Sequence, residues 1–306
     1  SAGAALAQTI DEPAELGERF TREVHVRLPV PPDEQRAYGR RIEAALARAQ
    51  ADSATPQYVL LVDRNALVQA AFIYRVGADG IAQFVGAAPV STGKPGEYDH
   101  FYTPLGVFPD EPSNMDYRAE GTKNAKGVRG YGATGMRVYD FGWVESDRGW
   151  GPPAKSTMRL QVHATDPELL ERTLGRARSQ GCIRIPASLN TFIDRYGLLD
   201  ADYEAAVKQG RVIPVLRDNR EPVPSAGRYL IVVDTQRTAR PEWVRAPGAP
   251  HASKKREPPV HPVKRFLTDL DQSTRAAGDS VVKVFDRTKR QLEAGARPAR
   301  KQSAGN

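Results

Sequence analysis

The chain contains a single cysteine, Cys182, within the segment RSQGCIRIP at residues 178–186. A cysteine nucleophile needs a base or a positive charge that promotes its thiolate, an accessible position, and donors for the oxyanion that its attack creates. His163 lies 19 positions before the cysteine, and Arg184 lies two positions after it. Gly181 permits a close backbone approach or a positive φ, which allows main-chain amides to face a carbonyl oxygen. These residue types predict attack by a thiolate on a carbonyl carbon.

The surrounding pattern predicts how the histidine and the cysteine come together. Alternating apolar and polar residues over 158–162 indicate a strand that ends at His163. A capping box with proline in the first turn predicts a helix over 166–174. This helix and the turns after it return the chain toward the strand. In an extended segment, Arg184 then shares a face with Cys182.

The cysteine has other interpretations. A lone cysteine often serves only as a small buried apolar residue, and it cannot form an internal disulfide. Papain-like and cell-wall amidase-type cysteine peptidases place the cysteine before the histidine, whereas only His251 and His261 follow Cys182 here. The histidines lack the close spacing of metal ligands, and no phosphate-binding G-x-x-x-x-G-K-[ST] segment is present. We therefore expect neither a metal nor a cofactor.

His163 followed by SQGCIR at residues 179–184, called the cysteine box below, resembles the signature of the L,D-transpeptidase (YkuD-type) catalytic domain. In that family a histidine precedes a Ser/Thr-His-Gly-Cys-apolar-Asn/Arg box by about this spacing. The segments STGKPG, TPLGVF and GRVIPV resemble the family's glycine turn, Thr-Pro-x-Gly segment and closing strand; they occupy residues 91–96, 103–108 and 210–215. The likeness covers about residues 57–216, and it implies a β-sandwich catalytic domain that binds peptidoglycan stem peptides.

The resemblance also implies roles for single residues. Cys182 would be the nucleophile, and His163 the base that takes its proton. A main-chain carbonyl near Ala164 would orient the histidine ring. The amides of Gly181 and Cys182 would lie in or near the oxyanion hole. The residues that shape the pocket would be Ser179, Gln180 and Arg184.

Two positions depart from the family pattern. Gln180 replaces the histidine that is usual in the box, and Ala164 replaces the usual glycine after the first histidine. A glutamine can donate a hydrogen bond but cannot exchange protons near neutral pH. Because His163 fills the role of base, we expect Gln180 to tune the pocket of an active enzyme. The alternative is a catalytically degenerate peptidoglycan-binding module with the same fold.

The expected activity is that of an exported cysteine acyl-transferase acting on tetrapeptide stems. The thiolate would attack the amide carbonyl at the L-centre of a diamino acid, expel D-Ala and leave a thioester. An amine of a second stem, a protein lysine or water would then take the acyl group. The sequence leaves open which acceptor is used.

The remaining pattern predicts a mainly β protein with short helices. We divide it into an N-terminal lead-in (1–54), a catalytic domain (55–236) and a basic, proline-rich tail (237–306). Strands are expected over residues 23–28, 58–62, 66–76, 81–90, 103–108, 211–216 and 229–233, and helices over 33–51 with Asp33 as N-cap, 188–196 and 200–209. Residues 110–155, rich in turn formers, predict long loops around an edge strand near 138–143.

The tail carries the basic charge of the protein. Residues 237–306 contain 16 Lys/Arg against 7 Asp/Glu, a net charge of +9, whereas the whole chain has +7. A weak apolar stripe over 263–292 predicts one or two helices. These are either solvated or an electrostatic tether to an anionic membrane or wall surface. No nucleic-acid-binding module is recognisable, so nucleic acid is not expected as a partner.

The N-terminal residues bear on localisation. The run Ala5-Leu6-Ala7 before Gln8 has the small-residue character of a signal-peptide cleavage region, with an Ala-rich disordered start as the alternative. No apolar run approaches the roughly 20 residues that span a bilayer. We expect an exported protein of the periplasm or cell envelope.

Overall fold

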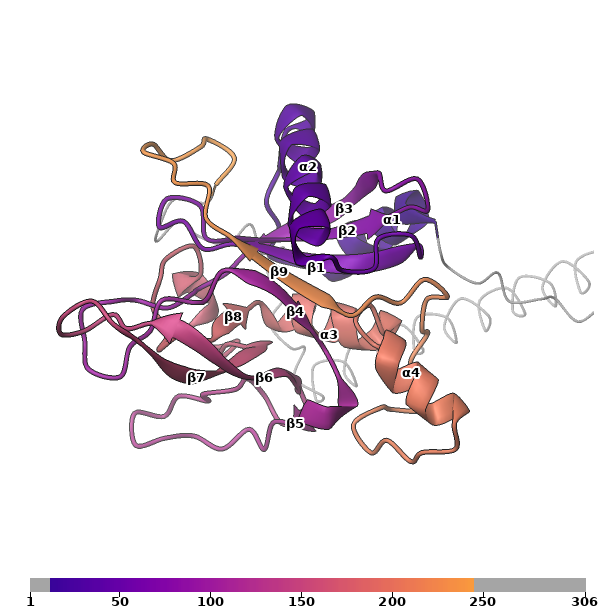
Figure 1. The fold of residues 1–306 in the computed structure, drawn as a ribbon. Coiled ribbons are helices and arrows are strands. Elements are labelled where there is room, and N and C mark those ends of the chain that lie inside the picture. The colour runs from indigo at the N-terminus through magenta and orange to yellow at the C-terminus, as the bar shows by residue number, and fades with distance from the viewer. Residues whose placement is uncertain (1–11, 245–306) are drawn as a thin grey trace, which may run out of the picture. The chain divides into compact units, whose positions relative to one another are not determined.

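Two β-sheets face each other across an apolar core in the computed structural model, which describes residues 12–244 (Figure 1). The first sheet has the strand order β3-β2-β1-β9-β4, and the second has the order β5-β6-β7-β8. The strands are β1 (Gln57–Asp63), β2 (Ala70–Val76), β3 (Ala82–Pro89), β4 (Gly106–Pro109), β5 (Tyr117–Arg118), β6 (Arg137–Asp147), β7 (Lys155–Ala164), β8 (Ile183–Ile185) and β9 (Tyr229–Val233). Two neighbouring pairs are parallel, β1 with β9 and β7 with β8, and the others are antiparallel.

Short helices complete the described part of the chain. They are α1 (Pro13–Glu23), α2 (Pro32–Ala49), α3 (Ala187–Tyr196) and α4 (Ala201–Lys208), with 3-10 helices at η1 (Pro112–Asn114) and η2 (Glu171–Thr173). The prediction of a sheet-rich protein with short helices is therefore confirmed. Within residues 12–244, no helix is both long and apolar enough to cross a lipid bilayer.

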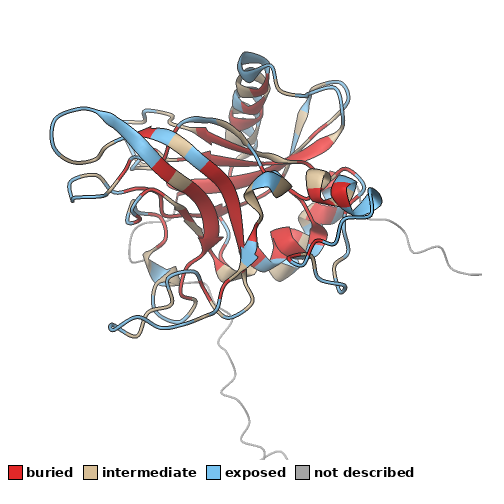
Figure 2. Ribbon diagram, turned by 60° about the horizontal axis from the view of Figure 1, so that its bottom comes forward, coloured by how far each residue is buried: buried red, intermediate tan, exposed pale blue. Residues whose placement is uncertain are grey.

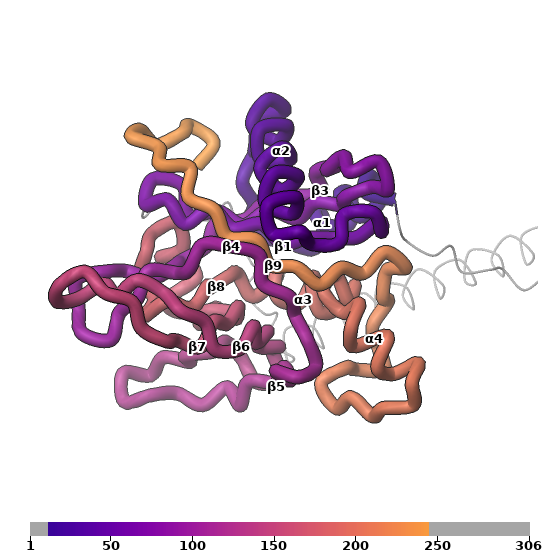
Figure 3. The backbone as a smooth tube through the Cα atoms, in the orientation of Figure 1, coloured from indigo at the N-terminus to yellow at the C-terminus, as the bar shows by residue number. Residues whose placement is uncertain are grey.

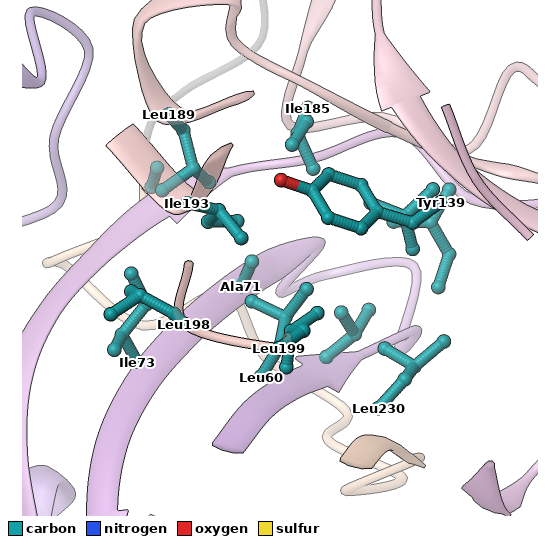
Figure 4. Packing of buried hydrophobic residues seen from close by; sticks show 14 of the residues in the cluster. Leu60, Ala71, Ile73, Tyr139, Ile185, Leu189, Ile193, Leu198, Leu199 and Leu230 are labelled. Carbon is teal, nitrogen blue, oxygen red and sulfur yellow. The ribbon is translucent and has the colours of Figure 1, made fainter. Parts of the chain in front are cut away.

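The first sheet is buried on both faces, because one face packs against the second sheet and the other against α2 (Figure 2). Leu60 and Val62 of β1 belong to the core between the sheets, together with residues of β7 and β8. Figure 4 shows this core, with Leu60 on one side and Tyr139 and Ile185 on the other. The alternate residues of β1 belong to a second core, which α2 covers. The period-two alternation of strand side chains thus accounts for both layers.

The lead-in supplies side chains to both cores. Helix α1, which the sequence analysis did not predict, begins with proline and buries Leu16 and Phe20, one turn apart, between the sheets. The predicted helix over 33–51 is present as α2, but its N-cap is Pro31 rather than Asp33. The predicted strand over 23–28 is wrong. That segment has alternating burial, yet it shares only isolated hydrogen bonds with neighbours, such as Leu28 N–H to Ala87 O at 2.9 Å.

Three further predictions differ from the structure. The helix expected over 166–174 is a turn followed by η2, because the Asp166 carboxylate accepts the amides of Glu168 and Leu169 in a turn that does not continue. No strand forms over 211–216. The strand near 138–143 is part of β6, which is an interior strand rather than an edge.

The packing of the first sheet continues past residue 236. Trp243 and Val244 belong to the core beneath α2, and the Trp243 ring lies 5.9 Å from that of Phe72 and 6.1 Å from that of Tyr38. The predicted tail helices over 263–292 lie outside the described residues.

A buried ion cluster fixes β6 against the helices. Arg137 is fully buried; its Nε donates to Asp116 Oδ2 at 2.7 Å, and its Nη1 lies 2.7 Å from Asp200 Oδ1. Asn190 of α3 pairs with both the N–H and the C=O of Arg137, at 3.2 and 2.8 Å. Removing one partner of such a buried pair costs roughly 3–5 kcal/mol. Strand β6 therefore gives β7, its neighbour in the sheet, a rigid support.

We expect Phe20→Ala to reduce the free energy of unfolding by about 3–5 kcal/mol, because Phe20 is 2% exposed and its ring packs edge-on against Phe192 at 5.3 Å. Urea denaturation followed by circular dichroism measures this change. Arg22→Ala on the same helix, where the side chain is 61% exposed, is the matched control and should change stability little. Equal stability of Phe20→Ala and wild type would show that α1 is not part of the folded core.

Candidate active site

The second sheet has one apolar and one polar face, and the polar face carries the candidate site. Leu160 and Val162 of β7 are fully buried in the core between the sheets. Arg159, Gln161 and His163 alternate with them and therefore lie on the opposite, outer face. The alternation predicted for this strand thus places the polar side chains together on one surface.

The parallel pairing of β7 with β8 brings the cysteine box to this face (Figure 3). His163 is in register with Arg184, and Val162 with Ile183. Cys182 immediately precedes β8, one register step further, so it lies beside Gln161 and shares the face of Arg184. His163 and Cys182 are thus diagonal neighbours on adjacent segments of the sheet, although 19 positions separate them in sequence.

The His163 ring is held in one tautomer. Its Nδ1 lies 2.9 Å from the carbonyl oxygen of Ala164, as the resemblance implies. A carbonyl can only accept, so Nδ1 carries the hydrogen and Nε2 keeps its lone pair. The ring is 3% exposed and lies 4.6 Å from the ring of Tyr131. Burial lowers the pKa of His163 to about 4, with a smaller effect from the charge of Arg184 in the same direction. The imidazole is therefore a neutral base at neutral pH.

A tight turn presents the cysteine. Ser179 Oγ accepts the N–H of Gly181 at 3.1 Å and donates to the carbonyl of Cys182 at 2.5 Å. Gly181 has φ +135°, and a Cβ there would lie 2.7 Å from the Met158 methyl, so glycine is required by both conformation and packing. The Gly181 amide, which the resemblance places in or near the oxyanion hole, donates to Ser179 Oγ in this structure. The amide of Cys182 is the remaining donor of the predicted pair.

The segments that precede the site in sequence support this turn. Thr103 Oγ1 donates to the Gly181 carbonyl at 2.7 Å and accepts the Gly93 N–H at 2.9 Å. The Phe101 N–H donates to the Gln180 carbonyl at 3.1 Å. Ser91 pairs with Arg184 through both of its main-chain groups, each at 2.9 Å. The STGKPG and TPLGVF segments therefore adjoin the cysteine box in space.

The thiol of Cys182 is half-buried and protonated at rest. Burial raises the pKa of this thiol. A hydrogen bond from the main-chain N–H of Gln161 and the charge of Arg184 only partly oppose this effect. Its Sγ lies 3.8 Å from the Arg159 carbonyl, and among the described residues no hydrogen bond joins it to the His163 ring. The pair is thus a neutral thiol beside a neutral base. A thiolate forms only when a proton moves to the imidazole during attack.

Arg184 is a half-buried cation that lacks a counter-ion in residues 12–244. Its Nε is buried without a hydrogen-bond partner, and no carboxylate of the described chain pairs with its guanidinium. Burial lowers the pKa of Arg184. A desolvated guanidinium next to a nucleophile suits recognition of a carboxylate on the substrate.

The two departures from the family pattern lie in different surroundings. Gln180 is exposed, and its side chain makes no hydrogen bond with the part of the chain that the structure describes. Ala164 is fully buried. A Cβ placed on Gly132 would lie only 2.7 Å from the Ala164 methyl, so the loop before β6 passes directly over this position. The loop that carries Tyr131 thus passes close to Ala164, whereas Gln180 faces solvent.

Several residues of this face were not predicted. Asp140 of β6 is 1% exposed and accepts hydrogen bonds from Arg159 Nε at 2.7 Å and Gln161 Nε2 at 2.8 Å. The alternation over 158–162 predicted that Arg159 and Gln161 share the face of His163, but it gave no sign of their buried partner Asp140. Tyr131 lies in a glycine-rich loop without periodicity, and nothing in the sequence places it on the histidine.

Two surface hollows lie away from these residues. One of about 390 Å³ is lined by Arg64, Tyr102 and the 147–154 hairpin, and one of about 450 Å³ lies between α2 and β4. Neither is lined by Cys182 or His163.

Comparison with known proteins gives little guidance. No family model matches the chain, and no curated protein matches it. Among solved structures, the chain is similar to the helical cell shape determining protein Pgp2 from Campylobacter jejuni, with 11% sequence identity and a TM-score of 0.26. The match covers 78% of this chain and 57% of that protein, so the chain spans little more than half of its length. A likeness at this level carries no conclusion about function.

The buried histidine makes stability depend on pH. The folded pKa of His163 is about 4, whereas an unfolded histidine has a pKa of about 6.5. As pH falls from 6.5 to 4 the unfolded state binds this proton and the native state does not, so the native state loses about 3 kcal/mol. We expect urea denaturation at pH 7 to 4 to show a shallower loss for His163→Gln than for wild type. His25→Gln, at an exposed histidine, is the control. A wild-type slope in His163→Gln would contradict the burial of a neutral ring.

Proposed function

We propose that this protein is a cysteine acyl-transferase of the L,D-transpeptidase type, acting on peptidoglycan tetrapeptide stems in the cell envelope. The observation that carries the proposal is the His163 ring, whose Nδ1 is fixed by the Ala164 carbonyl. Its Nε2 is then available as a base on the face that Cys182 shares. The resemblance of the cysteine box supports the choice of substrate, and it supports a YkuD-type interpretation of the two-sheet fold.

The reaction follows from these groups. The Cys182 proton passes to His163 Nε2 as sulfur attacks the carbonyl carbon between the diamino acid and the terminal D-Ala. The oxyanion that forms is stabilised by the Cys182 amide. Collapse breaks the C–N bond, the imidazolium protonates the departing amine of D-Ala, and a thioester remains. An acceptor amine or water then attacks the thioester, gives its proton to His163 and restores the thiol.

Arg184, whose charge no described carboxylate balances, would bind the substrate in this reaction. A tetrapeptide stem ends in the carboxylate of D-Ala, one residue beyond the attacked carbonyl. Arg184 lies on the face of Cys182 and has no carboxylate partner among residues 12–244. It would bind the terminal carboxylate through charge-assisted hydrogen bonds and so align the scissile bond.

A degenerate peptidoglycan-binding module is the second candidate. It is favoured by the resting geometry, in which Cys182 has a raised pKa and no hydrogen bond to His163. The exposed Gln180 in the cysteine box also fits this alternative. Hydrogen bonds of catalytic groups often tighten only when substrate is bound, so acylation of the cysteine distinguishes the two candidates.

Incubation with a carbapenem should add the mass of one drug molecule to the protein, because the strained lactam carbonyl is open to attack by Cys182. Intact-protein mass spectrometry measures the adduct. Cys182→Ala should remain unmodified, and His163→Gln should react at least about tenfold more slowly, because the attacking thiol loses its base. A wild-type protein that stays unmodified, with its thiol shown to be reduced, would favour the binding module.

Replacing Arg184 by methionine should slow acylation by a free tetrapeptide by about 10- to 100-fold, as expected for the loss of a charge-assisted bond. A tetrapeptide with an amidated C-terminus lacks the carboxylate, and the variant should process it nearly as fast as wild type does. Release of the C-terminal residue is followed by chromatography. Arg178→Met, at an exposed neighbour, is the control. Equal losses on both peptides would assign Arg184 to the thiol rather than to the substrate.

A further inference from the structure

The polar face of the second sheet continues beyond the cysteine as a row of exposed aromatic side chains. Trp143 is 66% exposed, Tyr131 is 42% exposed and Tyr117 is 40% exposed. Trp143 is in register with Arg159, the Tyr117 hydroxyl lies 3.3 Å from Gln161 Nε2, and the Tyr131 ring packs against the His163 ring at a tilt of 54°. The three rings therefore lie on the outer face of the second sheet, together with the candidate catalytic residues.

A β-bulge in β6 orients the Trp143 side chain toward this face. The pairing of β6 with β7 shifts between Asp140 and Trp143, so that Phe141 enters the core while Asp140 and Trp143 both face outward. Gly142 allows the bulge with φ +78°, and its N–H donates to Asp140 Oδ1 at 2.9 Å. The exposed indole is thus held by a specific backbone feature.

The polar groups between the rings are fixed and nearly neutral. Asp140 accepts from both Arg159 and Gln161, and the Arg159 guanidinium lies over the indole of Trp143 at 5.7 Å. The two terminal nitrogens of Arg159 make no hydrogen bond within the described chain and remain available as donors. The charge of Arg159 is balanced by Asp140, in contrast to that of Arg184.

We propose that Trp143, Arg159 and Tyr117 form a saccharide subsite that binds the glycan carrying the stem peptide, an inference that rests on the proposed function. A pyranose ring has an apolar C–H face that packs on an indole and a polar edge that accepts hydrogen bonds from a guanidinium and a phenol. A charge-balanced platform of this kind fits an uncharged sugar better than a phosphate or a carboxylate.

The spacing of the two sites agrees with the substrate. Trp143 lies two strands from the chain of Cys182 and two residues along the sheet, a separation of roughly 12 Å at standard strand spacings. The attacked carbonyl belongs to the third residue of the stem, and three extended residues span about 10–11 Å. A stem whose sugar lies on Trp143 therefore reaches Cys182 in an extended conformation.

The first test is binding of a linear tetramer of N-acetylglucosamine, measured by calorimetry on Cys182→Ala, in which no chemistry occurs. We expect Trp143→Ala in this background to weaken binding by about tenfold or more and Trp143→Phe to recover part of the loss, because a flat ring is restored. Tyr98→Ala removes an 83% exposed aromatic ring that packs edge-on against Trp150, away from the subsite. This variant should bind like the parent. Equal binding by Trp143→Ala and its parent, or no binding by the parent, would overturn the subsite.

The second test compares acylation of otherwise wild-type protein by disaccharide-tetrapeptide and by free tetrapeptide. Trp143→Ala should lose about tenfold on the disaccharide substrate and little on the free peptide. Equal losses on both would overturn the saccharide subsite while leaving the acyl-transferase intact. Binding of the tetramer that depends on Trp143, in a protein that is acylated by neither substrate, would instead support the subsite and reject the proposed function.

Discussion

The parallel register of β7 with β8 is the constraint on which the candidate site depends. It sets His163 opposite Arg184 and leaves Cys182 one step away on the same face. A slip of one residue would turn the cysteine into the core between the sheets and expose Ile183. The register is held from both sides, because Ser91 pairs with Arg184 on the far edge and the ion cluster of Arg137 fixes β6 on the near side.

Burial sets the electrostatics of the site. The same desolvation that keeps His163 neutral also keeps the Cys182 thiol protonated. Before substrate binds, the two residues are therefore both neutral and do not form an imidazolium–thiolate ion pair. Arg184 is left with its charge uncompensated by the described residues, while Arg159 is neutralised by Asp140. One face thus offers an unpaired cation beside the nucleophile and a balanced, aromatic surface further along. These two environments suit the two chemically different ends of a glycan-linked peptide.

Much of this arrangement could be predicted from sequence because the signals are local. Alternation over 158–162 predicted strand β7, which ends at Ala164, one residue after the predicted end at His163. The cysteine box predicted the extended segment that carries Arg184. The helix expected over 166–174 failed because Asp166 closes a turn with its own side chain. The aromatic row depends on a bulge and on a loop whose positions follow from tertiary packing. No periodic pattern in the sequence predicts that Tyr131 contacts the ring of His163, 32 positions away.

The central claim is that Cys182 accepts the acyl group of a stem peptide. The direct measurement mixes the protein with excess tetrapeptide, quenches the reaction within its first turnovers and maps the peptides of the protein. The expected result is a burst of free D-Ala equal to the protein concentration, with the tripeptide acyl group attached to the peptide that contains Cys182. D-Ala release that persists in Cys182→Ala, or a wild-type protein with a reduced thiol that never carries the acyl group, would contradict it.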